Sequence, residues 1–342
     1  MLGRIVYGMA LVIFVAGTAA DALAGAAAEF YKGKTVRILV GASAGGAFDT
    51  WGRMLGRHLG KQIPGNLSVV VENVTGAGGL ILANQVYKSQ RTDGLTIATF
   101  NGSLLMGQIL GRPGIEFDAR RFEYLGVPAK FDSVCAFSKA SGITSFERWK
   151  AAKAPVKVGG TAPGSNTVDI PRVLQLVFAL PTQIITGYKG FAEVRLAVDG
   201  GELAGACAGW DGLKLLWGKQ IEAGDVFAIM QTRSQPLADL PKVPLLMDFA
   251  NNDDDRQLIE AGVQFPALLS LAYALPPGTP KDRVQLLRKA FLDTLASPDM
   301  QADVQRARLS SDPSTGEELQ KIVERLFKLP PAIANKLKEV LK

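Results

Sequence analysis

Residues 36–49, VRILVGASAGGAFD, contain the pattern that decides the fold. The apolar run from Val36 to Val40 is typical of a buried β-strand, and the glycines at 41, 45 and 46 mark a tight turn. Apolar residues then recur at helical spacing, at Phe48, Trp51, Leu55 and Leu59. A buried strand that leads through a glycine turn into an amphipathic helix is the basic unit of an α/β protein.

The same alternation of strand and helix continues along the chain. Further strand-like runs are found at 67–71, 95–100, 134–137, 156–158, 184–186, 203–208 and 226–230. Helices are predicted at 48–59, at 79–87 and after a capping box made by Thr144 and Glu147. The last hundred residues have a helical pattern, with start signals at Thr279 and at Thr315 with Glu318. We therefore expect an α/β fold of two lobes with mostly parallel sheets and a helical tail.

Length and charge narrow the classes of function. The 342 residues correspond to about two domains, because a typical domain has roughly 150 residues. The net charge is +6, but no window combines dense Lys and Arg with aromatic residues. A nucleic-acid partner is therefore not expected.

The amino terminus has the features of a secretory signal peptide. Arg4 precedes an apolar stretch at 5–16, and small residues follow at 22–28, so we assign residues 1–28 to a signal peptide. An uncleaved anchor is the alternative interpretation of this segment. The predicted location of the mature protein is the periplasm. In that oxidising compartment Cys135 and Cys207 can form a disulfide, but their apolar surroundings favour two buried free thiols.

The glycine turn at 41–46 is open to three interpretations. Residues 41–45 match the G-x-S-x-G elbow of a serine hydrolase, with Ser43 as nucleophile. The general base of such an enzyme is normally a histidine well downstream, whereas the one histidine, His58, lies in the helix after the turn. The phosphate-binding patterns of nucleotide sites are incomplete. The third interpretation, a backbone cradle for a carboxylate at the helix start, is the one we favour.

Three further glycine-led loops share this design. They lie at 72–79, 159–167 and 187–191, each between a predicted strand and a helix. Open α/β sheets bind ligands at the carboxyl ends of their strands, so loops in both lobes predict a site with two halves. Neither metal-ligand spacing nor a paired carboxylate is found, and no cofactor or metal is expected.

In their order and spacing these motifs resemble the periplasmic receptors of tripartite tricarboxylate transporters, the Bug proteins. The matching segments include Tyr31–Lys34, Ser43–Asp49, Val70–Asn73, Thr75–Gly79, Thr92–Thr96, Thr161–Ser165, Gly187–Gly190, Leu203–Gly205 and Pro276–Pro280. The resemblance implies a two-lobed periplasmic-binding-protein fold of the Venus-flytrap, type II-like kind. The first lobe would comprise 29–127 plus 238–342, and the second lobe 128–237.

The resemblance also implies a set of ligand-binding residues. In the first lobe these are Ser43, Ala44, Gly45, Gly46, Ala47, Asp49, Gly78 and Gly79, with Asn101 and Ser103 on the same side. The second lobe would contribute Ser165, Asn166, Thr167, Tyr188, Lys189 and Gly190, and we add Trp210 and Asp211. Two segments depart from the family pattern: Ser43 stands where a proline is usual, and 205–211 differs where selectivity would be set.

The implied function is non-catalytic. A small organic acid would be captured between the lobes through backbone N–H groups and delivered to a membrane permease of the tripartite tricarboxylate type. Two alternatives remain open from the sequence, a secreted hydrolase that uses Ser43 and a sensing module that docks on a signalling partner.

Overall fold

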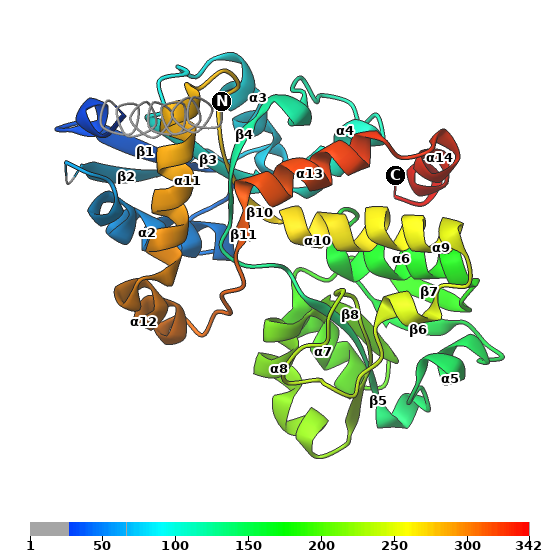
Figure 1. Ribbon diagram of the computed structural model, residues 1–342. Helices are drawn as coiled ribbons and strands as arrows, with labels where there is room; N and C mark the ends of the chain where they lie inside the picture. Colours follow the sequence, from blue (N-terminus) through cyan, green and yellow to red (C-terminus); the bar gives the residue numbers. More distant parts are fainter. Residues whose placement is uncertain (1–26, 66, 342) are drawn as a thin grey trace, which may run out of the picture. The chain divides into compact units, whose positions relative to one another are not determined.

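The computed structural model describes residues 27–65 and 67–341. Nearly all of the predicted signal peptide at 1–28 therefore lies outside the described residues. The chain forms two compact units (Figure 1). The first contains the residues up to Asn101, Gly114–Ala129 and Leu271–Gln320, and the second contains Gly102–Pro113, Lys130–Ser270 and Lys321–Lys342.

This division differs from the predicted lobes in three segments. The second unit includes 102–113, 238–270 and 321–342, which the prediction assigns to the first lobe. The reason lies in helix packing, because the helices at 253–259 and 331–340 contact the helix at 166–178 of the second unit. The transition near 127–130 agrees closely between the two divisions.

The first unit is built on a six-stranded sheet with the order β11-β4-β10-β3-β1-β2. Its strands are β1 (Thr35–Val40), β2 (Ser68–Asn73), β3 (Thr96–Asn101), β4 (Glu123–Val127), β10 (Leu271–Leu275) and β11 (Ser314–Thr315). Strands β1, β2 and β3 are parallel, whereas β10 pairs antiparallel with both β3 and β4. The sheet is therefore mixed rather than mostly parallel, and β10 corrects the expectation that the last hundred residues contain helices alone.

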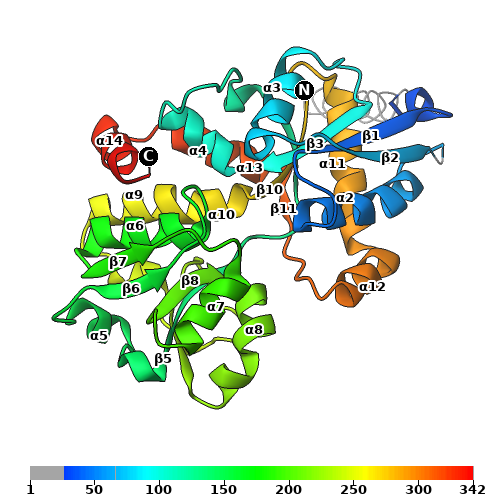
Figure 2. The ribbon, with the colours of Figure 1, turned by 180° about the vertical axis from the view of Figure 1, so that it is seen from behind.

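Helices cover both faces of this sheet. The chain steps from β1 to β2 and then back past β1 to β3, so right-handed crossovers place α2 (Ala47–His58) and α3 (Leu80–Lys88) on opposite faces. The helices α11 (Lys281–Ala296) and α12 (Pro298–Arg306) pack beside α2 (Figures 1 and 2). The core between α2, α11 and the sheet includes Trp51, Leu55, Tyr273 and Phe291.

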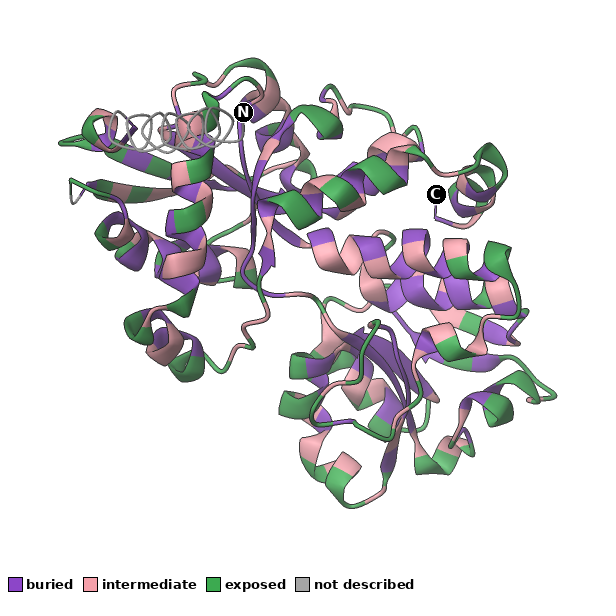
Figure 3. Cartoon of the chain, viewed as in Figure 1, coloured by how far each residue is buried: buried purple, intermediate pink, exposed green. Residues whose placement is uncertain are grey.

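The second unit contains a five-stranded sheet with the order β7-β6-β8-β5-β9. Its strands are β5 (Ser133–Ser138), β6 (Val156–Gly159), β7 (Thr182–Ile185), β8 (Gly205–Gly209) and β9 (Val226–Gln231). Its helices are α4 (Ser103–Ile109), α5 (Phe146–Lys150), α6 (Asn166–Phe178), α7 (Phe191–Asp199), α8 (Trp210–Glu222), α9 (Asp253–Ile259), α10 (Phe265–Leu269) and α14 (Pro331–Val340). A π-helical turn at Glu260–Gln264 joins α9 to α10, and α13 (Gly316–Phe327) spans the border of the two units. The strands of both sheets are mostly buried (Figure 3).

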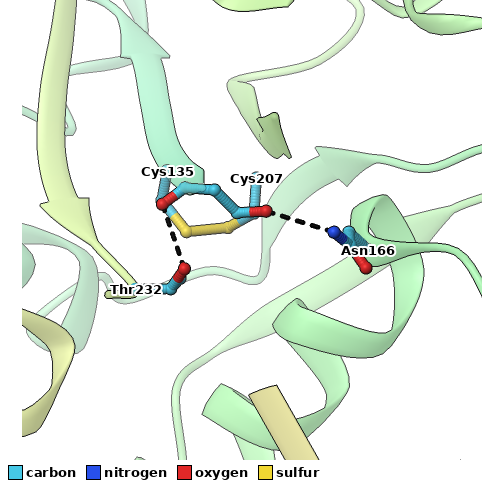
Figure 4. Close-up of a disulfide and its surroundings, with 5 residues drawn as sticks. Cys135, Asn166, Cys207 and Thr232 are labelled. Atoms are coloured by element: carbon cyan, nitrogen blue, oxygen red, sulfur yellow. Dashed lines mark hydrogen bonds between the residues drawn. A yellow bond between two sulfur atoms is a disulfide. The ribbon is translucent and has the colours of Figure 1, made fainter. Parts of the chain in front are cut away.

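Cys135 and Cys207 form a disulfide in the second unit (Figure 4). The two residues lie directly opposite each other in the antiparallel pair of β5 and β8, and both are fully buried. The preference for two free thiols was therefore wrong. Sequence separation alone does not reveal that these two strands are neighbours, and their register places the side chains together.

The predicted capping residues at the starts of helices are confirmed in one case and shifted in another. The capping box of α13 is confirmed, because the Glu318 carboxylate accepts from the Thr315 N–H and the Thr315 hydroxyl accepts from the Glu318 N–H. At α5 the cap is Ser145, one residue later than predicted. In the described part of the chain, no helix has both the length and the apolar character that a membrane crossing requires.

Candidate functional site

The first unit presents predicted site residues along one edge of its sheet. Because β1, β2 and β3 are parallel, their carboxyl ends meet at the same edge. Residues 41–49, 73–79 and 101 lie at these ends, and we call them the first rim. Every residue predicted for the first lobe except Ser103 belongs to it.

Asp49 is the polar centre of the first rim. Its side chain is buried, and its carboxylate accepts from the Gly45 N–H at 2.9 Å, from Arg53 Nε at 2.9 Å and from Asn73 Nδ2 at 2.9 Å. The hydrogen bond from Arg53 is the largest cause that lowers the pKa of Asp49 from 3.8 to about 2. Asn73 Nδ2 also donates to the Ala42 carbonyl, so the loop is fastened at both ends. Asp49 therefore holds the loop in its conformation through these hydrogen bonds.

The loop held by Asp49 exposes its backbone. Residues 43–47 are all exposed, and α2 begins at Ala47 with no side chain capping its start. The first-turn N–H groups of a helix have no partner within the helix, and together with the helix dipole they favour an anion. At Gly46 the backbone is extended, and a Cβ there would meet only the Ser43 carbonyl oxygen, at 3.8 Å. Ligand atoms can therefore approach this backbone closely.

Gly79 packs against the first loop. It is buried with a φ of +94°, and a Cβ there would lie 3.0 Å from the Gly41 carbonyl oxygen. Only glycine adopts this conformation readily while leaving that space open. The Gly78–Gly79 turn thus lies directly beside the end of β1, and Asn101 follows next to Gly79 at the end of β3.

The hydrolase interpretation of Ser43 finds no support in this geometry. Ser43 precedes α2, and His58 is the last residue of that helix, about 16 Å further along at the rise of an α-helix. His58 Nε2 lies 2.9 Å from Asp303 Oδ2 on α12, where Arg57 also donates to the same carboxylate. The chain's one histidine is therefore engaged at the far end of the helix.

The second unit forms a comparable edge. Strand β6 runs parallel to β7 and β8, while β5 is antiparallel to β8 and β9. The carboxyl ends of four strands and the amino end of β5 therefore share one edge. We call the residues there, 130–133, 160–167, 186–190, 209–211 and 231–233, the second rim.

The loop before α6 repeats the plan of the first rim. The Gly164 N–H donates to the Asp169 carboxylate at 3.0 Å, as Gly45 does to Asp49. Burial raises the pKa of Asp169, in contrast to that of Asp49. The hydroxyls of Thr161, Ser165 and Thr167 lie 2.9 to 3.1 Å from one another and hold the loop in place.

Asn166 and Ser103 come together in the second unit. Asn166 Nδ2 donates to the Ser133 hydroxyl at 3.3 Å, beside the disulfide (Figure 4). Asn166 and Ser103 also line one pocket with Arg112 and Asp169. Ser103 was expected beside Asn101, but Gly102 packs so closely on Leu269 that α4 joins the second unit.

The remaining predicted residues of the second rim differ in how far their side chains are exposed and already hydrogen-bonded within the unit. The Tyr188 hydroxyl donates to Glu202, and the Lys189 N–H donates to Glu193 before Gly190 caps α7. Asp211 is exposed and pairs with Lys214 at 3.6 Å. The Trp210 side chain is buried in the core of this unit and donates through Nε1 to Asp239 at 3.0 Å. Of Trp210, the backbone rather than the ring belongs to the rim.

Ser133 and Phe131 belong to the second rim but were not among the predicted site residues. Ser133 accepts from Asn166, and Phe131 is an exposed aromatic residue whose ring packs on Gly209. Only one weak signal marks Phe131 in the sequence, an aromatic residue in a polar connection before a strand. In the part of the chain that the structure describes, no group of three or more His, Cys, Asp or Glu side chains is arranged to hold a metal ion.

Comparison with known proteins identifies the family that this chain matches. The family model described as "Tripartite tricarboxylate transporter family receptor" matches residues 53–333. A curated relative from Cupriavidus necator, the "UPF0065 protein in gbd 5'region", is 24% identical over 330 residues, which cover 94% of each chain.

Solved structures share the fold at low sequence identity. A TctC solute binding protein from Polaromonas has a TM-score of 0.72 at 18% identity, covering 90% of this chain and 97% of its own. MatC from Rhodopseudomonas palustris, with bound malate, has a TM-score of 0.58 at 17% identity, covering 90% and 99%. R. palustris Rpa4515, with adipate, has a TM-score of 0.60 at 20% identity, covering 89% and 97%.

The α/β periplasmic-binding-protein fold expected from the sequence is thereby confirmed. The family model covers most of the chain, and its match agrees with the resemblance found in the loop motifs. This chain belongs to the tripartite tricarboxylate transporter receptor family.

Proposed function

We propose that this protein is a periplasmic receptor that binds a small organic carboxylate and delivers it to a tripartite tricarboxylate-type permease. The first rim would hold a carboxylate through the backbone N–H groups at 43–47 and at 78–79. From the second rim, Ser165, Asn166, Thr167 and Lys189 would contribute hydrogen bonds and a positive charge. The protein itself would perform no chemical reaction.

One observation carries this proposal, the exposed backbone at the start of α2. The helix start is uncapped, and no side chain extends from Gly45 or Gly46 over it. The nearby negative charge of Asp49 is compensated by Arg53, so it does not repel an incoming anion. Preorganised N–H donors of this kind form strong, charge-assisted hydrogen bonds to carboxylate oxygens.

Relatives support the chemical class of the ligand. The R. palustris proteins with the same fold hold malate and adipate, which are both dicarboxylates. The family description, which names a transporter receptor, supports a permease as the partner. Loss of carboxylate uptake by cells that lack this protein, restored by the wild-type chain, would support delivery, and unchanged uptake would contradict it.

The direct test is thermal unfolding of the mature chain with mono-, di- and tricarboxylates, each beside its neutral amide. A ligand at a hundred times its dissociation constant adds about 2.7 kcal/mol of stability. We expect at least one acid to raise the unfolding temperature while its amide does not. Equal shifts with acid and amide would contradict the carboxylate cradle.

Gly46→Val is expected to weaken binding of that acid at least about tenfold, ~1.4 kcal/mol, with the fold retained. The extended backbone at Gly46 accepts a side chain, but the branched carbons would occupy the space above the N–H groups. Isothermal titration calorimetry measures the change. Gly218→Val is the control, because a Cβ at this position on α8 meets nothing within 4 Å. Equal affinity of Gly46→Val and wild type for the acid would show that this loop is not part of the binding site.

A further inference from the structure

Phe131 is an exposed aromatic side chain within the second rim. It exposes 41% of its surface, although it lies two residues before the buried Ser133. A Cβ at Gly209 would lie 2.8 Å from its ring, so the ring rests against the backbone of a residue that has no side chain. Part of the ring is thus packed on the rim, and the rest is in contact with solvent.

The position of this ring is fixed by the sheet. Ser133 pairs with Gly209 and Cys135 with Cys207, so the disulfide locks the register of the two strands that carry the contact. The Trp210 N–H donates to the Asp132 carbonyl at 2.7 Å, and the Phe131 N–H donates to the Ala267 carbonyl at 3.2 Å. The ring is therefore a preorganised surface rather than a mobile side chain on a loose loop.

Polar groups lie on the same rim as this ring. Asp132 is paired with Arg233 at 2.9 Å, which compensates its charge, and Asn166 and Ser133 form a neutral hydrogen-bonded pair. Small-molecule sites combine an apolar surface with a few placed polar groups in this way.

We propose that Phe131 contacts the apolar body of the ligand, so that this receptor selects acids with an extended apolar chain or a ring over compact hydroxylated acids. The inference rests on the proposed carboxylate function and specifies its substrate class. Adipate carries such a body, whereas malate has a shorter chain with a hydroxyl group. Each methylene moved from water onto the ring contributes up to about fourfold in affinity.

The test is calorimetric titration of the wild-type chain with succinate, glutarate, adipate and suberate, beside malate, tartrate and phenylacetate. We expect affinity to rise about two- to fourfold per methylene up to adipate, with malate and tartrate at least tenfold weaker than adipate. Phe131→Ala should abolish this chain-length dependence and lower adipate affinity about tenfold. Phe131→Leu should restore the aliphatic series but bind phenylacetate more weakly than the wild type, because it offers no aromatic ring.

Leu215→Ala is the matched control, because Leu215 on α8 is 70% exposed and lies outside the second rim. It should leave the whole series unchanged. Clear binding with the same chain-length dependence in Phe131→Ala, or tighter binding of malate than of adipate by the wild type, would overturn this inference alone. Absence of binding by every acid would overturn the proposed function and this inference with it.

Discussion

Replacement of both Cys135 and Cys207 by alanine is expected to lower the free energy of unfolding of the second unit by about 4 kcal/mol. The disulfide joins residues 72 positions apart, and a cross-link over a loop of this size removes a large part of the entropy of the unfolded chain. It also ties β5 to β8 in the middle of the second sheet. Denaturant titration with a probe in the second unit, such as Trp217 fluorescence, measures the loss.

Reduction provides the control for this experiment. Reductant should destabilise the wild-type chain by a similar amount and leave the double variant unchanged, because the variant has no bond to break. The first unit, which contains neither cysteine, should keep its own transition midpoint. An unfolding midpoint of the second unit that is the same in wild type and double variant would contradict the assigned role of the disulfide.

Asp49→Ala is expected to cost about 3 kcal/mol in the first unit and to weaken ligand binding more than tenfold. The substitution leaves the Gly45 N–H, Arg53 and Asn73 without their shared acceptor, and hydrogen bonds to a charged group contribute about 1.5–3 kcal/mol each. The loop at 43–47 would then lose the shape that presents its backbone. Chemical unfolding and calorimetric titration measure the two effects separately.

Asp299→Ala is the matched control, since Asp299 also lies in the first turn of a helix but is exposed and pairs with the exposed Lys61. It should change stability by less than about 1 kcal/mol. A similar small effect for Asp49→Ala would show that the carboxylate does not hold the loop.

Lowering the pH should also reveal the contribution of Asp49 to the stability of the first unit. The folded pKa of Asp49, about 2, is below its ordinary value of 3.8, so the folded state favours the charged form. The resulting stabilisation of about 2 kcal/mol is fully present above pH ~4 and is lost as the pH falls toward 2. The stability of Asp49→Asn should therefore fall less steeply over this window. A parallel pH profile in wild type and variant would contradict this assignment.

Local patterns in the sequence predict much of the fold. The strand, turn and helix at 36–49 and the capping box of α13 need only neighbouring residues, and the structure contains both. Strand β10 was missed because its five residues lie among helices and gain their partners from β3 and β4. The disulfide depends on the register of β5 and β8, which the sequence does not state.

The residues of the candidate site also fall into those that a local sequence pattern reveals and those that depend on distant contacts. Glycine loops that follow strands are visible in a sequence, so the loops of both rims were placed at sheet edges from their order alone. Phe131 and Ser133 could not be picked out in this way, because their contacts with Gly209 and Asn166 join residues more than thirty positions apart. Conversely, tryptophan is a residue type that is common in ligand pockets. The structure shows instead that the Trp210 ring packs in the core of the second unit.

The position of β10 also determines the order in which the two sheets can form during synthesis. All five strands of the second sheet have been made when the growing chain reaches Gln231, whereas the first sheet lacks its middle strand until Leu275. Until then β3 and β4 each have an edge without its final neighbour, and such edges favour aggregation. The first rim lies at the edge of this sheet, so we expect it to reach its final form only after Leu275 has been synthesised.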